Sequence, residues 1–565
     1  MIWEEKILKL LKKIRESELE KISMKHFAGI ILVILVFYPM FIKGIMCNDE
    51  LLLRLWSQKG IKSFFQTTIY NEYILKGRVL GAIGNLKFMS FLSDNKYIFG
   101  LINSAFLFLS IVLFGYLTYK ILKNREFSIL LCVLISIFLP INFEFAVPNA
   151  FVIVCLEPMI ILECSLIIYI DYLDNYNRKK FFVSIGLFLW SMFLYEFLIT
   201  YVLLFPAIYI IKNIDKKISI KKVIYASFPW VTVSVIYLIL YFLQGYLFPS
   251  NYEGTHLSFN SLTSILNVLK ILFVAVFPTY FSYFNDKYKY LFELYNSGNV
   301  TFENVFNPII IIFGLSLFVL LYFLLSKNKI LEKKKFLDLK EILILAVAIV
   351  YGFLPALPNA LTPMYQEGVT VESFTWIPVS IYLYFAVMFS LTFIFFKLVT
   401  HLKFKGISWI CILVIIVSSV GVQIRNHVFV KEQVSNYDRI VAIENVIKLD
   451  YWKQYGAISV FAPSLYETMN SMAIEKDHWS QFAKIYNNDL YFEDEYNSAQ
   501  NAVLVVQENN DFYFYFDNVQ LLISKEKKGG EISVKDVQGN YKIVKVEDSI
   551  WNEGDYSVCL LSSVK

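Results

Sequence analysis

The sequence predicts an all-α polytopic membrane protein of about eleven membrane segments, followed by a C-terminal extracytoplasmic α+β domain. The first observation is composition, because 57% of the 565 residues are hydrophobic, whereas soluble chains are about 45–50% apolar. The second is that the excess occurs in runs of about 18 residues or more, which can cross about 30 Å of hydrocarbon. The third is that apolar and polar residues alternate in the last part of the chain, as in β-strands.

Residues 1–25 form a charged N-terminal segment that precedes the first apolar run. No small-residue cleavage site follows that run, so the segment is not interpreted as a cleavable signal peptide. It fits either an amphipathic helix on the cytoplasmic membrane surface or a plain solvated helix.

The transmembrane domain is expected over residues 26–425. Basic clusters between the apolar runs are assigned to the cytoplasm by the positive-inside rule, since loops 142–149, 249–262 and 359–375 contain neither Lys nor Arg. The N-terminus is then cytoplasmic and the C-terminal domain lies outside the plasma membrane. Spans are expected near residues 26–46, 97–122, 127–145, 150–173, 223–248, 304–327, 341–358, 376–400 and 406–424.

Residues 181–211 do not fit a simple span. They are apolar, yet both flanks are basic, and two full helices need roughly forty residues. A broken hairpin with its tip near Tyr195 and Glu196 would fit; one long tilted helix with a buried Glu196 is the alternative. Residues 263–284 are expected to lie as a helix along the outer membrane surface.

Residues 426–565 are expected to form the extracytoplasmic α+β domain. From residue 430 onward, 13 Lys and Arg stand against 21 Asp and Glu, a net charge of −8, so the rest of the chain carries +13 of the total of +5. No catalytic motif is evident in this domain, and no nucleic-acid partner is expected.

The external loop 47–96 carries the main candidates for chemistry. Asp49 and Glu50 follow the first apolar run. A partly desolvated carboxylate there has a raised pKa and can accept a proton from a hydroxyl group; an ordinary acidic pair that ends a span is the alternative. The loop is net basic, and cations such as Arg54, Lys76 and Arg78 could hold a phosphate, which the arginine fork suits well.

Further acidic residues lie in or beside the membrane runs. Buried carboxylates are costly in a bilayer and mark function by default. Glu144 and Glu196 would lie at helix breaks, whereas Glu157 lies inside a span with Glu163 six residues further on. Tyr195 adjoins Glu196 at the expected break. Each of these residues either lines the site or is a structural partner for other side chains.

These motifs resemble the GtrII-like glucosyltransferases, of the GT-C class of polytopic membrane glycosyltransferases. The resemblance is carried by the acidic pair after the first span, by GRVL at 77–80 and by LYEFL at 194–198. It is clearest over residues 30–210 and extends as general architecture to about residue 425. This chain has Asn48-Asp49-Glu50 rather than a plain Asp pair, which leaves the division of roles between the two acids open.

The resemblance implies a GT-C-like fold and a sugar, such as glucose, transferred from a polyprenyl-phosphate donor to a cell-surface glycan acceptor on the outer face. Asp49 would be the catalytic acid/base residue, and Arg54 and Arg78 would bind the donor phosphate. No cofactor is implied, since the donor arrives in the lipid bilayer; a divalent cation held by Asp49 and Glu50 is possible but not favoured. Rival interpretations are a polymerase or ligase acting on lipid-linked oligosaccharide, and a lipid or glycan transporter.

Overall fold

The computed structural model describes most of the membrane domain and the C-terminal domain. The described residues are 24–42, 48–78, 80–81, 87–93, 95–141, 152–216, 219–250, 261–274, 307–326, 337–363, 366, 379–401, 405–462, 465, 476–493, 502–508, 511–516, 519–524, 530–535, 541–553 and 556–563.

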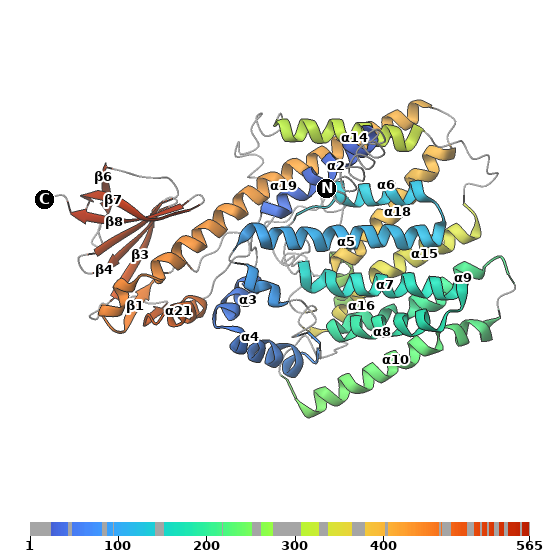
Figure 1. Cartoon of the computed structure of the whole chain (residues 1–565), viewed down its shortest axis with the longest axis horizontal. Helices are drawn as coiled ribbons and strands as arrows, with labels where there is room; N and C mark the ends of the chain where they lie inside the picture. Colours follow the sequence, from blue (N-terminus) through green and yellow to red (C-terminus); the bar gives the residue numbers. More distant parts are fainter. Residues whose placement is uncertain are drawn as a thin grey trace, which may run out of the picture.

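Long helices form a bundle in which the first, α2 (Met24–Ile42), lies beside the last, α19 (Lys405–Ile447) (Figure 1). In the described part of the chain, six segments are long and apolar enough to cross a membrane, which indicates a membrane protein. The count of about eleven segments is not confirmed. The six are Lys96–Leu122, Val152–Asn175, Glu196–Asn213, Ile220–Leu247, Ser380–Thr400 and Trp409–His427.

The helices of the bundle follow the apolar runs of the sequence. Their bounds are α2 Met24–Ile42, α5 Lys96–Leu122, α6 Arg125–Ile137, α7 Val152–Asn175, α10 Ile220–Leu247, α14 Pro308–Ser326, α15 Leu339–Phe353, α18 Ser380–His401 and α19 Lys405–Ile447.

Polar residues set where several of these helices begin. Asn95 and Asn124 accept hydrogen bonds from the first backbone N–H groups of α5 and α6. Asp338 and Glu341 form a reciprocal capping box at the start of α15. Such caps satisfy donors that have no partner inside the helix.

Residues 181–211 form a hairpin. Helix α8 (Arg178–Leu194) ends at Tyr195, which is extended (φ −151°, ψ 116°), and the chain returns through η4 (Glu196–Leu203) and α9 (Leu204–Asn213). Lys180, near the start of α8, bonds to Asp171 of α7. Lys212, near the end of α9, bonds to Asp174. Both ends of the hairpin therefore meet the same end of α7.

The first loop folds into short helices at one end of the bundle. They are α3 (Asn48–Gln58), α4 (Ile61–Thr68), the π-helix η2 (Ile69–Leu75) and the 3₁₀ helix η3 (Lys87–Leu92). Figure 1 shows α3 and α4 between the long helices and the C-terminal domain.

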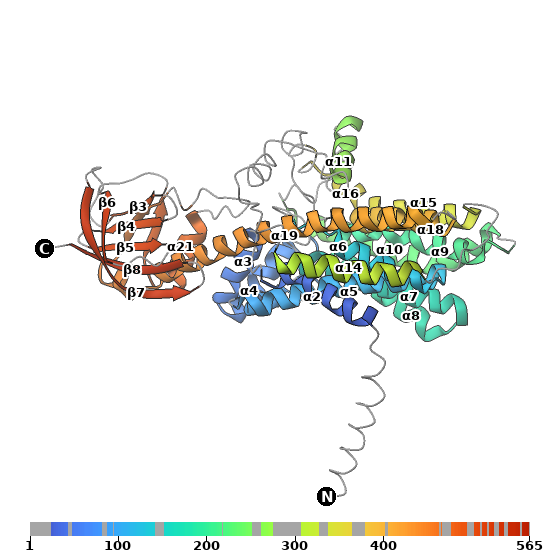
Figure 2. The same cartoon turned by 90° about the horizontal axis from the view of Figure 1, so that it is seen from above.

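Helix α11 (Leu262–Val274) contains the described part of the segment expected to lie along the membrane surface. It packs against α16 (Ala356–Ala360) and α18. Figure 2 shows it crossing the direction of the bundle helices instead of running along them.

The C-terminal domain contains one eight-stranded sheet of order β2-β1-β3-β4-β5-β8-β7-β6. Strand β1 pairs in parallel with β2 and β3, and the remaining neighbours are antiparallel. The elements are β1 Ile458–Phe461, α21 Lys476–Ile485, β2 Leu490–Glu493, β3 Ala502–Glu508, β4 Asp511–Phe516, β5 Val519–Ser524, β6 Gly530–Lys535, β7 Tyr541–Glu553 and β8 Tyr556–Ser563.

Helix α19 joins the two parts without a break. Its 43 residues run from the bundle to the sheet (Figures 1 and 2). The expected domain boundary at residues 425 and 426 lies inside this helix, because the apolar run ends there while the helical backbone continues. One hydrophobic core extends from the bundle through α19 to one face of the sheet.

Candidate functional site

A charged cluster centred on Arg78 lies where the first loop meets the tip of the hairpin. Arg78 Nε donates to Glu196 Oε2 at 2.7 Å, and Arg78 Nη2 donates to Glu196 Oε1 at 2.8 Å. The guanidinium carbon lies 4.0 Å from the centre of the Tyr195 ring. A two-bond fork and a stacked ring fix the guanidinium more firmly than a single ion pair would.

Glu72 brings a second carboxylate to Arg78. Its Oε2 lies 3.5 Å from Arg78 Nη1, its Oε1 accepts from Lys76 Nζ at 3.2 Å, and its backbone carbonyl accepts from the Arg78 N–H at 2.8 Å. Two cations and two carboxylates thus meet in one cluster. Burial lowers the pKa of Arg78, but its interactions with Glu196, Tyr195 and Glu72 outweigh burial and raise that pKa well above its ordinary value.

The backbone before Arg78 is shaped by Gly77 and by α10. Gly77 has a φ of 73°, and a Cβ added there would lie 2.8 Å from Gln244 Oε1. Gln244 Nε2 donates to the carbonyls of Tyr73 and Ile74 at 2.8 and 3.0 Å, at the end of the π-helix. Only glycine combines this left-handed turn with so close an approach. Single π-helical segments are frequent at functional sites.

Arg54, predicted for the same phosphate-binding task, has a different partner. Its Nη1 bonds to Glu444 of α19, and the two side chains are 6% and 1% exposed. Glu50, one turn earlier on α3, is also buried. The structure therefore does not bring Arg54 into the Arg78 cluster through any contact between described residues.

The remaining predicted residues are placed as follows. Asp49 lies in the first turn of α3, and its side chain is outside the described part of the structure. Glu144 also lies outside the described residues. Tyr195 and Glu196 form the hairpin tip, as expected, and Lys76 belongs to the cluster through its bond to Glu72.

Glu157 lies apart, inside α7 with Glu163. The two residues are 6% and 0% exposed. Among the described residues, Glu157 Oε2 and both carboxylate oxygens of Glu163 have no hydrogen-bond partner. A buried carboxyl group without hydrogen-bond partners is costly in a bilayer, so Glu157 and Glu163 are candidates for a function of their own.

Two partners of the predicted arginines were not singled out from the sequence. Glu72 could have been found, because it stands four residues before Lys76 in a helical pattern, the spacing of an ion pair. Glu444 had no local signal, since 390 positions separate it from Arg54.

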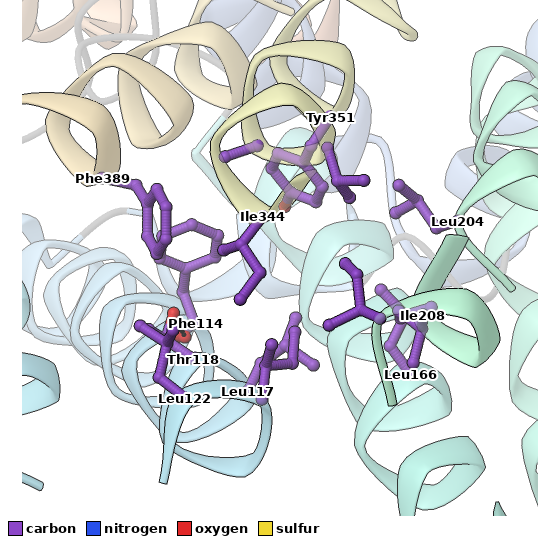
Figure 3. Close-up of a pocket in the computed structure, with 14 residues that line it drawn as sticks. Phe114, Leu117, Thr118, Leu122, Leu166, Leu204, Ile208, Ile344, Tyr351 and Phe389 are labelled. Carbon is purple, nitrogen blue, oxygen red and sulfur yellow. Dashed lines mark hydrogen bonds between the residues drawn. The ribbon is translucent and has the colours of Figure 1, made fainter. Parts of the chain in front are cut away.

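An apolar cavity of about 60 Å³ lies elsewhere in the bundle, between α5, α7, α9, α15 and α18. Figure 3 shows Phe114, Leu166, Leu204 and Tyr351 facing it from different helices. It shares no residue with the Arg78 cluster, so the two features are separate.

Among the described residues, no group of three or more His, Cys, Asp or Glu side chains has the arrangement of a metal site. No known family model matches the chain, and no curated protein matches its sequence significantly.

Proposed function

We propose that the protein is a membrane glycosyltransferase that transfers a sugar, such as glucose, from a polyprenyl-phosphate donor to a glycan acceptor at the cell surface. The observation that carries the proposal is the meeting of Arg78 with Tyr195 and Glu196. These residues come from two of the three motifs on which the family resemblance rests, 77–80 and 194–198.

The chemistry of the cluster supports a phosphate ligand. Arg78 remains charged, and its planar fork matches two phosphate oxygens as well as it matches the Glu196 carboxylate. Glu196 is the more exposed partner, with 23% of its side chain accessible against 9% for Arg78. A donor phosphate would therefore reach Arg78 from the exposed side of Glu196 and displace that carboxylate.

The proposed reaction is an inverting transfer. The acceptor hydroxyl gives its proton to Asp49, and its oxygen forms a bond to the anomeric carbon. The bond between that carbon and the phosphate oxygen breaks, and polyprenyl phosphate leaves with the electron pair. Arg78 stabilises the negative charge that grows on the leaving phosphate.

The test compares cells that carry the intact chain, Asp49→Asn, Arg78→Lys, or no copy of the chain. Arg125→Lys is the matched control, because Arg125 is exposed at the start of α6. Surface glycans are analysed by mass spectrometry at equal membrane abundance of each variant. Transfer is then measured with the purified protein and synthetic polyprenyl-phosphate glucose.

The expected result is loss of one hexose from the glycan without the chain, with Asp49→Asn and with Arg78→Lys, and retention with Arg125→Lys. Loss without the chain but retention in Asp49→Asn would remove Asp49 from the mechanism. An unchanged glycan in all strains, together with no transfer in vitro, would refute the proposal.

A transporter of lipid-linked glycans is the second candidate, and the buried Glu157 and Glu163 favour it. Carboxyl groups inside a helix bundle often form proton or ion relays in transporters. Glu163→Gln separates the two candidates. A transporter would leave lipid-linked glycan on the inner leaflet, measured by accessibility to an external glycosidase, whereas a transferase would keep its sugar transfer.

A further inference from the structure

The extramembrane part of α19 packs against the first loop through several polar contacts. Lys96 Nζ donates to Asp438 Oδ1 at 2.9 Å, and the Tyr437 hydroxyl donates to the Ser93 carbonyl at 3.3 Å. Further along the same helix, Glu444 accepts from Arg54 of α3. All three contacts join α19 to the loop 47–96, which carries Asp49 and Glu50.

The sheet domain adds a second contact to α3. Helix α21 packs on α3, and Lys59 Nζ donates to Gln481 Oε1 at 2.9 Å. Asn488, which follows α21, donates to the backbone carbonyl of Ile447 at the end of α19. Each of the helices α3, α19 and α21 therefore contacts the other two.

The Arg54–Glu444 pair differs from the exposed ion pairs of this domain. Both of its side chains are almost fully buried, whereas Lys453 and Asp450 are 47% and 87% exposed. Removing one partner of a buried pair leaves an uncompensated charge, whereas exposed pairs contribute little. The buried pair can thus determine where α3 sits, and the exposed pair cannot.

We propose that Glu444 is a positioning residue that fixes α3 through Arg54 and thereby sets the location of Asp49 and Glu50. The part played in catalysis rests on the proposed glycosyl transfer. The C-terminal domain then acts as the outer support of the active-site loop, and Arg54 is a structural partner of Glu444 instead of a phosphate ligand.

The test measures two quantities for the full chain in lipid nanodiscs. The first is the steady-state kinetics of transfer from polyprenyl-phosphate glucose. The second, independent of any activity, is hydrogen exchange of the backbone amides of residues 48–58. The variants are Glu444→Gln, the exchanged pair Arg54→Glu with Glu444→Arg, and Asp450→Asn as the control.

Glu444→Gln is expected to lower kcat on the order of 10²-fold with KM for the donor unchanged, because a misplaced reacting group costs rate without weakening ground-state binding. Exchange in residues 48–58 should become faster. The exchanged pair should restore both quantities, and Asp450→Asn should alter neither.

Unchanged hydrogen exchange of residues 48–58 in Glu444→Gln would overturn the positioning role. A failure of the double variant, Arg54→Glu with Glu444→Arg, to recover either quantity would overturn it too. If the unaltered protein transfers no sugar while Glu444→Gln still speeds hydrogen exchange in α3, the proposed glycosyl transfer is refuted. The role of Glu444 in positioning α3 is then still supported. Unaltered transfer with wild-type kcat in Glu444→Gln would instead refute the inference and leave the transferase proposal intact.

Discussion

Arg54 and Arg78 come from one loop and were predicted to share one task, yet they lie in different surroundings. Arg78 bonds to two carboxylates and stacks on a tyrosine ring, beside a partly exposed Glu196. Arg54 bonds to Glu444, and both side chains are buried. We propose that the first arrangement exchanges a carboxylate for a phosphate, whereas the second is covered by α19 and has α21 packed on α3.

The comparison teaches that charge and spacing alone do not assign roles to arginines in such a loop. Each guanidinium is buried at a cost, and the partner that offsets this cost decides what the residue can do. For Arg78 the main partner comes from the hairpin, and for Arg54 it comes from α19.

The largest expected effect separates Arg78 from an exposed arginine. Arg78→Lys keeps the charge but loses the fork and the stacking on Tyr195, so transfer should fall on the order of 10²-fold. Arg125→Lys should leave transfer unchanged, since Arg125 is exposed. Rates of transfer from polyprenyl-phosphate glucose measure this effect. Equal rates for the two variants would show that the Arg78 fork has no part in the reaction.

The second prediction compares two glycines of the first loop, Gly77 directly before Arg78 and Gly60 after the helix that carries Arg54. Gly77 and Gly60 both have a positive φ, of 73° and 93°. A Cβ at Gly60 meets nothing within 4 Å, whereas a Cβ at Gly77 meets Gln244 and Tyr241. Gly60→Ala should lower the free energy of unfolding by about 1–3 kcal/mol through backbone strain alone, because a φ of 93° with a ψ of 160° is adopted almost only by glycine. Gly77→Ala should cost about 1–3 kcal/mol more through overpacking.

Thermal unfolding in detergent measures this difference. Tm should fall further for Gly77→Ala, and Gln244→Ala should remove part of the excess because it clears the crowded space. Equal Tm values for the two alanine variants would mean that α10 does not restrict the turn before Arg78.

The α3–α21 contact should depend on pH through His478. Burial, together with the charges of Arg54 on α3 and of Lys59 just after it, lowers the pKa of His478 from 6.5 to about 4. Lys448 of α19 also faces α21, over the rings of Phe482 and Tyr486. Between pH 6.5 and 4 the unfolded chain binds more protons at this position, so the free energy of unfolding falls as the pH falls, by up to about 3 kcal/mol.

Tm measured from pH 7.5 to 4 for the protein and for His478→Gln tests this effect. The variant should lose less stability over the same window, because its side chain does not titrate. Parallel curves would show that His478 takes up a proton equally well in the folded protein.

The smallest expected effect concerns the returning arm of the hairpin, which carries Glu196. The Tyr201 hydroxyl donates to the Tyr351 carbonyl at 2.9 Å and joins this arm to α15. Tyr201→Phe should lower the free energy of unfolding by about 1 kcal/mol. Tyr246→Phe is the control, because Tyr246 is 83% exposed. Equal Tm values for these two variants would contradict a contribution from the bond.

Much of the architecture could be predicted because the signal is local. Whether a segment is stable in a bilayer depends on the hydrophobicity of its own residues, so apolar runs marked helices such as α5, α7, α10 and α18. The alternation in residues 502–524 marked strands β3, β4 and β5. The basic flanks of residues 181–211 were also a local signal, but they left a broken hairpin and one long tilted helix open, and the extended backbone at Tyr195 decided for the hairpin.

The sequence by itself therefore determined the helical membrane domain, the sheet domain and the candidates Arg78 and Glu196. Only the tertiary structure decided that these two residues form one ion pair across 118 positions, and that Arg54 belongs to Glu444 across 390. The physical reason is that burial of an ion pair depends on how distant helices pack. Hydrophobicity can be read along the chain, whereas the partner of a buried charge is set by the fold.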